Sequence, residues 1–486
     1  MRLRPHNLVI LMSDEHNPKM LGCYGHDLVQ TPNLDRFAAR GTRFGTTYCG
    51  SPVCIPARAV FHTGRYIHRL GFWDNADPYD GSAPSWQHVL RDAGHHVAAI
   101  GKLHFRSAAD DNRFSEEIIT MHVVDGLGDL MGLVREDLPR RGSSKKMATL
   151  AGPGESDYTR YDRNIAAEAE RWLREEAPKH RDRPWVLMVS FVAPHFPLTA
   201  PADFYNLYPP DGLALPKQYA RGERPQHPYL KDYADSFAYD DYFENDGQVR
   251  RAITGYYGLC SSMDDNCGRV MRAIEDCGLG AETRILYTSD HGDNVGARGL
   301  WGKSTLYEEA AAVPLIVAGD GIPAGAVCST VASHVDCYPF ILEAVGLPVA
   351  ADDMTPLRCS IAHLAVGAAP ERTVLSEYHG MGSTTAAFMI RHGRFKYVHY
   401  VKYAPQLFDL GADPEELNDL AGEFAYREVL AECRLRLMSL CDPEDADRRA
   451  KARQAVSLAK NGGREAVIAR GDLGYSPPPG VAVEFS

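Results

Sequence analysis

The chain has 486 residues, which is long enough for one large α/β domain and a smaller appendage. Its composition is that of a globular protein, with 44% hydrophobic and 24% charged residues. The net charge of −12 excludes broad nucleic-acid binding, because that function needs a basic face, but it allows a local basic pocket for a small anion.

The N-terminal region predicts no export signal. The apolar stretch 8–12 is too short for a signal-peptide core, and no small-residue cleavage site follows it. No apolar run approaches the roughly 20 residues of a membrane helix. The eleven cysteines contain no CxxC pair, which is typical of buried thiols in a reducing compartment. We therefore expect a cytoplasmic protein with no membrane partner.

Short apolar runs bounded by turn residues predict five buried strands. They cover residues 8–12, 97–100, 186–191, 285–288 and 315–318. Near-continuous apolar strands that alternate with helices indicate a mostly parallel sheet covered on both faces. One crossover helix is expected at 258–277, where apolar residues recur at helical spacing and Gly278 ends the helix.

Polar residues follow four of these strands directly. They are Asp14, then Lys102 and His104, then His195, and finally Asp290 with His291. Open α/β sheets bind their ligands beyond the carboxyl ends of the strands. The sequence therefore predicts that these side chains meet at one edge of the sheet.

Two segments, 106–165 and 229–243, show poor periodicity. We expect them to be insertions over the site, where specificity resides. Their aromatic residues suit an aryl group or a quaternary ammonium, or simple packing.

The pattern changes after residue 376, so we divide the chain into a catalytic α/β domain (1–376) and a C-terminal subdomain (377–486). Residues 388–391 and 396–400 predict short antiparallel strands, and a charged helix is expected from about 416 to 440. The proline-rich tail 476–480 predicts an extended segment that packs on a neighbouring surface, which makes homo-oligomerisation through the tail a hypothesis.

Cys54 lies in the segment Ser-Pro-Val-Cys-Ile-Pro-Ala-Arg, residues 51–58. Pro56 suits the first turn of a helix, so Cys54 is expected at a helix N-terminus, where backbone N–H groups face an anion. Arg58 is one turn further on and can reach the same place. By itself this position fits an inert or redox-active cysteine with a lowered pKa, or a thiolate nucleophile.

The segment Cys54-Ile55-Pro56-Ala57-Arg58 resembles the Cys-x-Pro-x-Arg core of the type I sulfatase signature, and Thr63-Gly64-Arg65 resembles its extension. Further blocks resemble the same family in order along the chain: residues 31–35 with 39–41, 101–104, 289–293, and 407–410 with 413–416 and 418–420. The resemblance covers nearly the whole chain. It implies an alkaline phosphatase-like α/β fold, with a large sheet between helices and a smaller C-terminal α+β subdomain.

In the family that it resembles, the motif cysteine is oxidised to formylglycine by a dedicated maturation enzyme, which would make that enzyme a partner of this chain. One hydroxyl of the hydrated aldehyde attacks sulfur and expels the alcohol. Loss of a proton from the other hydroxyl then releases sulfate by C–O cleavage and restores the aldehyde. The resemblance thus implies that Cys54 becomes the nucleophile of a sulfate-ester hydrolase acting on aryl or small alkyl sulfates.

The resemblance also implies a divalent cation held by Asp14, Asp290, His291 and an oxygen of formylglycine-54. Its charge would lower the pKa of the hydrate. Oxygen ligands suit Ca²⁺, Mn²⁺ or Mg²⁺, and the imidazole favours Mn²⁺. Many sulfatases have two aspartates at the first site and Asp-Asn at the third, whereas this chain has Asp14-Glu15 and Asp290-His291. Asp14 is therefore expected to be the only ligand of its pair.

The remaining roles follow from the same resemblance. Arg58 would support the formylglycine hydroxyl, and Lys102 and Lys303 would bind sulfate oxygens. His104 would take the hydroxyl proton during release of sulfate, and His195 would hydrogen-bond or protonate the leaving oxygen. Asn75 resembles a sulfate-contacting residue of the choline-sulfatase branch.

Three alternatives stay open. Phosphonate monoester and phosphodiester hydrolases share the motif and the Asp-His pair, so they are the nearest competing activity. Choline sulfate is a candidate substrate through the branch resemblance. A catalytically dead scaffold is disfavoured, because Cys54, Arg58 and the metal ligands are all present.

Overall fold

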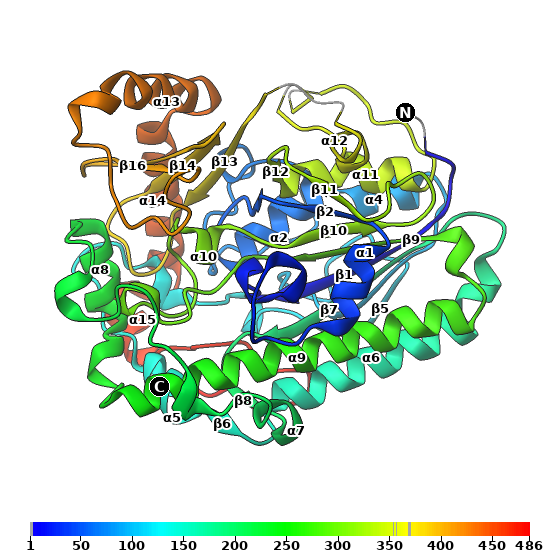
Figure 1. The fold of residues 1–486 in the computed structure, drawn as a ribbon, viewed down its shortest axis with the longest axis horizontal. Coiled ribbons are helices and arrows are strands. Elements are labelled where there is room, and N and C mark those ends of the chain that lie inside the picture. The colour runs from blue at the N-terminus through cyan, green and yellow to red at the C-terminus, as the bar shows by residue number, and fades with distance from the viewer. Residues whose placement is uncertain (1–2, 353, 356, 368–370) are drawn as a thin grey trace.

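The computed structural model describes residues 3–352, 354–355, 357–367 and 371–486, and these form a layered α/β structure (Figure 1). An eight-stranded sheet with the order β11-β2-β10-β9-β1-β7-β4-β5 lies at its centre. Its strands are β1 Asn7–Asp14, β2 Thr42–Phe44, β4 Val97–Lys102, β5 Glu116–Met121, β7 Val186–Pro194, β9 Thr283–Ser289, β10 Leu315–Ala318 and β11 Ala326–Cys328. All five predicted strands are confirmed, and four extend beyond their predicted ends.

The four central strands run in the same direction. β1 pairs in parallel with both β7 and β9, and β4 pairs in parallel with β7. β10 runs antiparallel to β9 and to β2, so the sheet is mixed but mostly parallel. The carboxyl ends of β9, β1, β7 and β4 therefore lie side by side at one edge, which is the arrangement that a ligand-binding crevice needs.

Both faces of the sheet are covered by helices, because alternate residues of its strands point to opposite sides. In β1, Val9 and Leu11 belong to one core, and Leu8 and Ile10 to another. The first core is completed by α1 Pro32–Ala39, α6 Asp157–Glu175 and α9 Asp246–Asp276, and the second by α2 Cys54–Thr63, α4 Trp86–Asp92, α11 Cys337–Ala344 and α12 Ile361–Ala365. Figure 1 shows α6 and α9 side by side below the sheet and α2, α4 and α11 above it.

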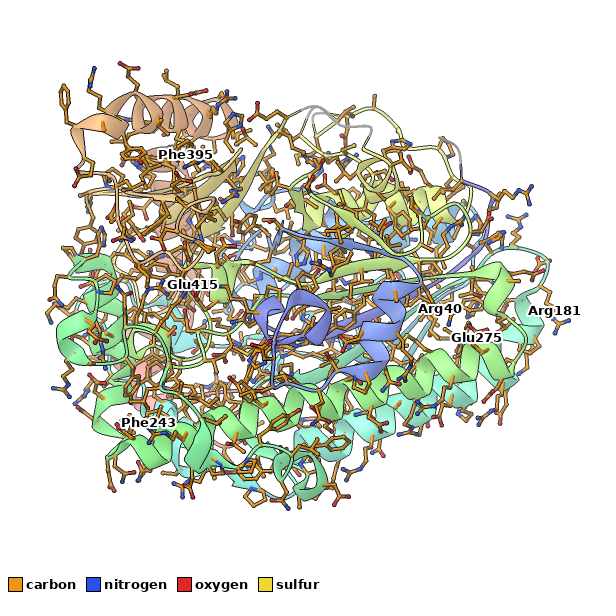
Figure 2. All side chains as sticks on the ribbon, in the orientation of Figure 1. Arg40, Arg181, Phe243, Glu275, Phe395 and Glu415 are labelled. Carbon is orange, nitrogen blue, oxygen red and sulfur yellow. The ribbon has the colours of Figure 1, made fainter. Side chains whose placement is uncertain are left out.

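The crossover helix predicted at 258–277 is confirmed, but α9 begins at Asp246, where the Asn245 side chain accepts the backbone N–H of Gln248. At its other end, Glu275 forms a 2.7 Å ion pair with Arg40, which follows α1; Figure 2 shows the two residues next to each other. This ion pair connects α1 and α9, which belong to the same helix layer.

The segment 106–165 is more regular than predicted. It contains the edge strand β5, the short helix α5 Lys145–Thr149 and the first half of α6, whose capping residue is Ser156. β5 escaped prediction because most of its residues are only half-buried, so it has no continuous apolar run. Helix α6 buries only one face, so its sequence is polar on average.

The C-terminal region contains a second, antiparallel sheet. Its strands are β13 Thr373–Tyr378, β14 Ala387–His392, β15 Phe395–Tyr400 and β16 Gln406–Asp409. The two predicted strands are confirmed as β14 and β15. β13 crosses the predicted domain boundary between residues 376 and 377. The charged helix predicted from about 416 begins only at Arg427, as α13 Arg427–Leu440, and α14 Pro443–Lys460 and α15 Gly463–Arg470 follow.

The remaining short elements connect these layers. They are β3 Thr47–Tyr48, β6 Gly152–Pro153, β8 Thr199–Ala200, β12 Ala332–Ser333, α3 Ile67–Leu70, α7 Ala202–Tyr205, α8 Pro228–Phe237 and α10 Glu308–Ala311. Within the described ranges, no helix has both the length and the apolar character that crossing a bilayer requires.

Candidate active site

The predicted convergence at the sheet edge is present. Asp14 and Lys102 are the last residues of β1 and β4, His195 follows β7, and Asp290 follows β9. All four side chains are buried. Because these strands are neighbours in the sheet, residues up to 276 positions apart in sequence come together at one place.

Cys54 lies opposite this edge of the sheet, at the start of α2. It is the first residue of α2, and the preceding Val53 is extended, so the helix begins where Pro56 predicted it would. The Sγ atom of Cys54 lies 3.2 Å from Nε2 of His291 and 3.1 Å from Nζ of Lys303. The N-terminus of α2 and the strand ends thus form one site.

Four side chains offer ligand atoms to a common point. The atoms of Asp14, Cys54, Asp290 and His291 all lie within 4.8 Å of one another, and all four residues are buried. Nδ1 of His291 lies 3.0 Å from the carbonyl oxygen of Gly292, so it donates its proton there and leaves the Nε2 lone pair for the cluster. Two carboxylates and one imidazole around the residue-54 side chain fit a divalent cation.

Arg58 holds two of these ligands in place. It is fully buried, and its guanidinium donates to Oδ2 of Asp290 at 2.9 Å and to Oδ2 of Asp14 at 3.0 Å. It also donates to the Lys102 carbonyl oxygen at 2.6 Å and to the Ser190 hydroxyl at 2.9 Å. Arg58 therefore fixes the positions of both aspartates and of the end of β4.

Two buried lysines complete the positive groups. Nζ of Lys102 lies 2.6 Å from Oδ2 of Asp14. Nζ of Lys303 lies near Sγ of Cys54, 2.8 Å from Nε2 of His195 and 3.4 Å from Oε2 of Glu15. Lys303 thus bridges the predicted nucleophile and the predicted leaving-group histidine.

Glu15 is a site residue that the sequence indicated only as a departure from the Asp-Asp pattern. It is fully buried at φ 68°, and burial raises its pKa to about 7 although Lys303 lowers it. With Glu15 included, three carboxylates (with Asp14 and Asp290) face three cations (Arg58, Lys102 and Lys303).

Both predicted catalytic histidines are neutral. Burial and the neighbouring Lys102 and Arg58 hold the pKa of His104 well below its usual range, and burial and Lys303 do the same for His195. Burial and nearby cations both disfavour an imidazolium at these two positions.

The thiol of Cys54 is also protonated in this environment. Burial and the negative charge of Asp14 raise its pKa to about 12, although Lys303 and Lys102 oppose the shift. The lowered pKa that a helix N-terminus suggests is thus overcome, because the dipole contribution is smaller than the cost of burying a thiolate. An unmodified thiolate nucleophile is disfavoured.

A pocket of about 770 Å³, its open mouth included, lies above Cys54. Both segments predicted to cover the site contribute to its wall: Asp129, Arg141, Ser143, Ser144 and Met147 from 106–165, and Tyr233, Phe237 and Tyr239 from 229–243. Asn75 also lines the pocket, and its Oδ1 accepts the Ile55 backbone N–H at 3.1 Å, so it caps the helix that carries Cys54.

The C-terminal tail enters the same pocket. Leu473 to Ser476 line it, and the Ser476 hydroxyl lies 2.8 Å from Nε2 of His104. The Ser476 carbonyl oxygen accepts the Tyr158 hydroxyl at 2.6 Å. The extended tail thus packs on the catalytic domain of its own chain. No local pattern could have predicted this, because the contact spans 372 positions.

Asp162 is another residue that sequence reasoning missed. Its carboxylate accepts the backbone N–H groups of Val192 at 2.7 Å and Ala193 at 2.8 Å, just before His195. It lies in α6, inside a stretch predicted to be irregular. Helix α6 therefore positions the segment that carries His195.

Together, an α/β sheet with buried metal-ligand residues at its strand ends and fixed cations around a helix-start residue defines a hydrolase of anionic esters. The sulfatase family model matches residues 6–347, and the model described as N-sulphoglucosamine sulphohydrolase, C-terminal, matches residues 296–442. The chain belongs to the sulfatase family, whose members hydrolyse sulfuric esters.

Several known proteins resemble the chain over most of its length. The choline-sulfatase of Rhizobium meliloti (strain 1021) is 32% identical over 428 residues, which cover 85% of this chain and 82% of that protein. Human arylsulfatase K is 28% identical, with 86% and 79% covered. The crystal structure of the phosphonate monoester hydrolase of Agrobacterium radiobacter has a TM-score of 0.70 at 23% identity, covering 90% of this chain and 95% of that one, and so shows the same fold.

Proposed function

We propose that this sulfatase hydrolyses sulfate monoesters of small alcohols with a formylglycine derived from Cys54. The observation that carries the proposal is the position of Cys54. Its Sγ lies within 3.2 Å of both His291 Nε2 and Lys303 Nζ, at the edge where Asp14 ends β1 and Asp290 follows β9. A side chain here has metal ligands on one side and an open pocket on the other.

The residues around position 54 suit the group that the family implies. Asp14, Asp290 and His291, with an oxygen of the modified residue, would hold the divalent cation, which would supply positive charge beside the nucleophile. A formylglycine hydrate would supply one hydroxyl to attack sulfur and a second whose proton loss releases sulfate and restores the aldehyde. The buried thiol, with its raised pKa, lacks this reactivity.

The fixed cations act on the ester. Lys102 and Lys303 stabilise the negative charge on the sulfuryl oxygens, and Arg58 holds Asp14 and Asp290 in place while this charge develops. Because each cation is buried and hydrogen-bonded beforehand, little reorganisation is needed during the reaction. Asn75, which caps α2 beside the nucleophile, is proposed to contact the sulfate as well.

The two neutral histidines move protons. Nδ1 of His195 donates to the Phe196 carbonyl oxygen at 2.7 Å, so its Nε2 accepts from Lys303, and this pair faces the leaving alcohol. His104 accepts the hydroxyl proton during release of sulfate, a role that a neutral imidazole can fill. A formylglycine-generating enzyme is the maturation partner that this scheme requires.

Phosphonate monoester hydrolysis is the second candidate. Arg58, Lys102 and Lys303 lie among the site's carboxylates, so with a divalent cation added the site would carry a positive charge that suits an anionic ester of either kind. Sulfate monoesters and phosphonate monoesters are both monoanions, whereas a phosphate monoester carries a second charge. Comparison of kcat/KM for 4-nitrophenyl sulfate, choline sulfate and a phenyl phosphonate ester decides between the two activities. A higher kcat/KM for the phosphonate ester would make phosphonate monoester hydrolysis the main activity.

The modification is tested by mass spectrometry of the peptide that contains residue 54, in protein made with a formylglycine-generating enzyme. We expect this peptide to be about 18 Da lighter than the cysteine form. Turnover should rise with the modified fraction, and Cys54→Ala should abolish it. Cys337→Ala, at a buried cysteine in the core behind the sheet, is the matched control and should stay active. Full activity in wholly unmodified protein would refute the proposal.

Cytoplasmic residence also stays a proposal, and it is supported by the cysteines, which are all free thiols in the structure. Homo-oligomerisation through the tail has less support, because residues 473–476 of the tail lie in the pocket of their own chain.

A further inference from the structure

A second group of metal-ligand side chains lies at the end of the sheet opposite Cys54. His96 directly precedes β4, Glu116 is the first residue of β5, and His180 ends the short 3₁₀ helix that follows α6. The active-site residues lie at the carboxyl ends of the parallel strands, so a group at the amino ends of β4 and β5 is about 20 Å away, the length of β4. Figure 2 shows Arg181, the residue after His180, at the right-hand end of the molecule.

The three side chains offer ligand atoms at close range. Two imidazole nitrogens and one carboxylate oxygen lie within 4.8 Å of one another. The rings of His96 and His180 are stacked, with centroids 3.7 Å apart and an angle of 17° between their planes. In a tetrahedral zinc site the ligand atoms are about 3.3 Å apart, so these three atoms need to approach one another by at most about 1.5 Å.

The His96 nitrogen nearest to Glu116 makes no hydrogen bond with the described residues. Nε2 of His96 lies 3.0 Å from Oε1 of Glu116, but the two atoms are not aligned as donor and acceptor. A metal ion satisfies both atoms, because it accepts a lone pair from each. The stacked imidazoles of His96 and His180 would repel each other if both were protonated, which favours the neutral form that binds a metal.

Trp172 of α6 orients the carboxylate. Its Nε1–H donates to Oε2 of Glu116 at 3.3 Å, so Oε1 is the oxygen that faces the histidines. The indole is fully buried, and its plane lies within 25° of the His96 ring and 14° of the His180 ring. The His96 carbonyl oxygen accepts the Val186 backbone N–H at 3.0 Å, which fixes the chain at this point. Ligands of metal ions are commonly held in place by outer hydrogen bonds of this kind.

A metal ion can reach this group from solvent. The side chains of His96 and Glu116 are 17% and 32% exposed, and His180 is also half-buried. Two imidazole nitrogens and one carboxylate oxygen are typical ligands of Zn²⁺, which takes a water molecule in the fourth position. Ca²⁺ and Mg²⁺ need mostly oxygen ligands, so they fit this group less well.

We propose that His96, Glu116 and His180 bind a Zn²⁺ ion at the amino end of the sheet. The ion connects β4, the edge strand β5 and the chain that leaves α6. Such a connection matters for β5, because this strand pairs only with β4 in the sheet and most of its residues are half-buried. The role of the ion is structural, and it does not depend on the chemistry proposed at Cys54.

The test is isothermal titration calorimetry of the full-length protein with Zn²⁺, after its metal has been removed with a chelator. The wild type should bind one Zn²⁺ ion more than His180→Gln, and His96→Gln should behave like His180→Gln. Loss of one ligand should weaken binding at this group by more than about 100-fold, since loss of an outer hydrogen bond alone costs about 10- to 100-fold. If both variants bind as many ions as the wild type with unchanged affinity, the proposal is wrong.

His122→Gln is the matched control. His122 is another half-buried histidine beside β5, and its Nε2 lies 3.0 Å from Oε2 of Glu117. Among the described residues, no third ligand side chain joins this pair, so the variant should keep the wild-type number of Zn²⁺ ions. The matured His180→Gln variant should also hydrolyse 4-nitrophenyl sulfate as the wild type does, because the group lies far from Cys54. A loss of zinc in His122→Gln equal to that in His180→Gln would contradict the assignment of the ligands.

Thermal unfolding provides an independent readout with Glu116→Gln, which keeps an oxygen acceptor for Trp172 and removes the charged ligand. Zn²⁺ at about 100 times its Kd should raise the Tm of the wild type by about 2–3 °C more than that of Glu116→Gln, because an ion that binds only the folded state stabilises it. Equal Tm shifts in the two proteins would mean an adventitious ion only, and would overturn the structural role.

Discussion

The Ser476 hydroxyl lies 2.8 Å from Nε2 of His104, although 372 positions separate the two residues in sequence. His104 has a positive φ of 58°, and its Nδ1 has no partner among the described residues. One ring nitrogen of His104 is thus held by the C-terminal tail. The contact with Ser476 therefore holds the His104 ring in one orientation, which a proton-accepting imidazole needs.

Ser476→Ala should therefore impair proton transfer rather than binding. We expect kcat to fall roughly tenfold with KM little changed, because an imidazole that is free to reorient is a poorer base. The pH profile of kcat should also shift, and Ser476→Thr should restore most of the activity. Ser486→Ala, in the same tail, is the control. If the Ser476→Ala and Ser486→Ala profiles coincide with that of the wild type, Ser476 has no positioning role.

Arg58 is expected to stabilise the fold as well as the site. Arg58→Ala leaves the buried carboxylates of Asp14 and Asp290 without their guanidinium, which should cost about 3–5 kcal/mol in the free energy of unfolding of metal-free protein. Urea denaturation measures the loss. The exposed Arg163, paired with Glu155, provides the comparison, since its removal should cost about 0–1 kcal/mol. Similar losses in the two variants would contradict a special role for Arg58.

The imidazole ligand should set the choice of metal. His291→Asn replaces a nitrogen ligand by an amide oxygen beside Asp14 and Asp290, and oxygen ligands favour Ca²⁺ over Mn²⁺. The metal is removed with a chelator, and Ca²⁺ or Mn²⁺ is then added back. The ratio of Ca²⁺-supported to Mn²⁺-supported activity should be roughly tenfold higher in the variant than in the wild type. Metal content measured by mass spectrometry provides a second readout. His122→Asn, just after the edge strand β5 and away from the cluster, should leave the ratio unchanged.

Acid should destabilise the protein through His62. Burial against Trp86 lowers the pKa of this side chain from 6.5 to about 3. Below pH 6.5 the His62 side chain is therefore protonated in the unfolded chain but not in the folded chain. The free energy of unfolding keeps its full value above pH 6.5. It falls by about 1.4 kcal/mol per pH unit as the pH drops from 6.5 toward 3. His62→Gln should flatten this part of the stability–pH curve. A stability–pH curve parallel to that of the wild type would disprove the assignment, and His227→Gln, at a partly exposed histidine, is the control.

Local sequence was enough to predict the scaffold and most of the nucleophile's surroundings. Apolar runs such as 186–191 specify buried parallel strands, and the polar residue that follows each run must then lie at the carboxyl edge of the sheet. For this reason the strand pattern alone predicts that Asp14, Lys102, His195 and Asp290 lie together. Pro56 likewise indicates the start of α2, and with it the position of Cys54.

Tertiary structure alone decided the walls of the pocket and the protonation of its groups. Asp129, Arg141 and Ser476 come from segments without periodicity, and their positions depend on contacts across hundreds of residues, which no local pattern encodes. The low pKa of His104 and the high pKa of the Cys54 thiol depend on burial and on nearby charges. Sequence thus determined which chemistry the chain can carry, and the folded environment determined the protonation state of each group and which residues line the pocket.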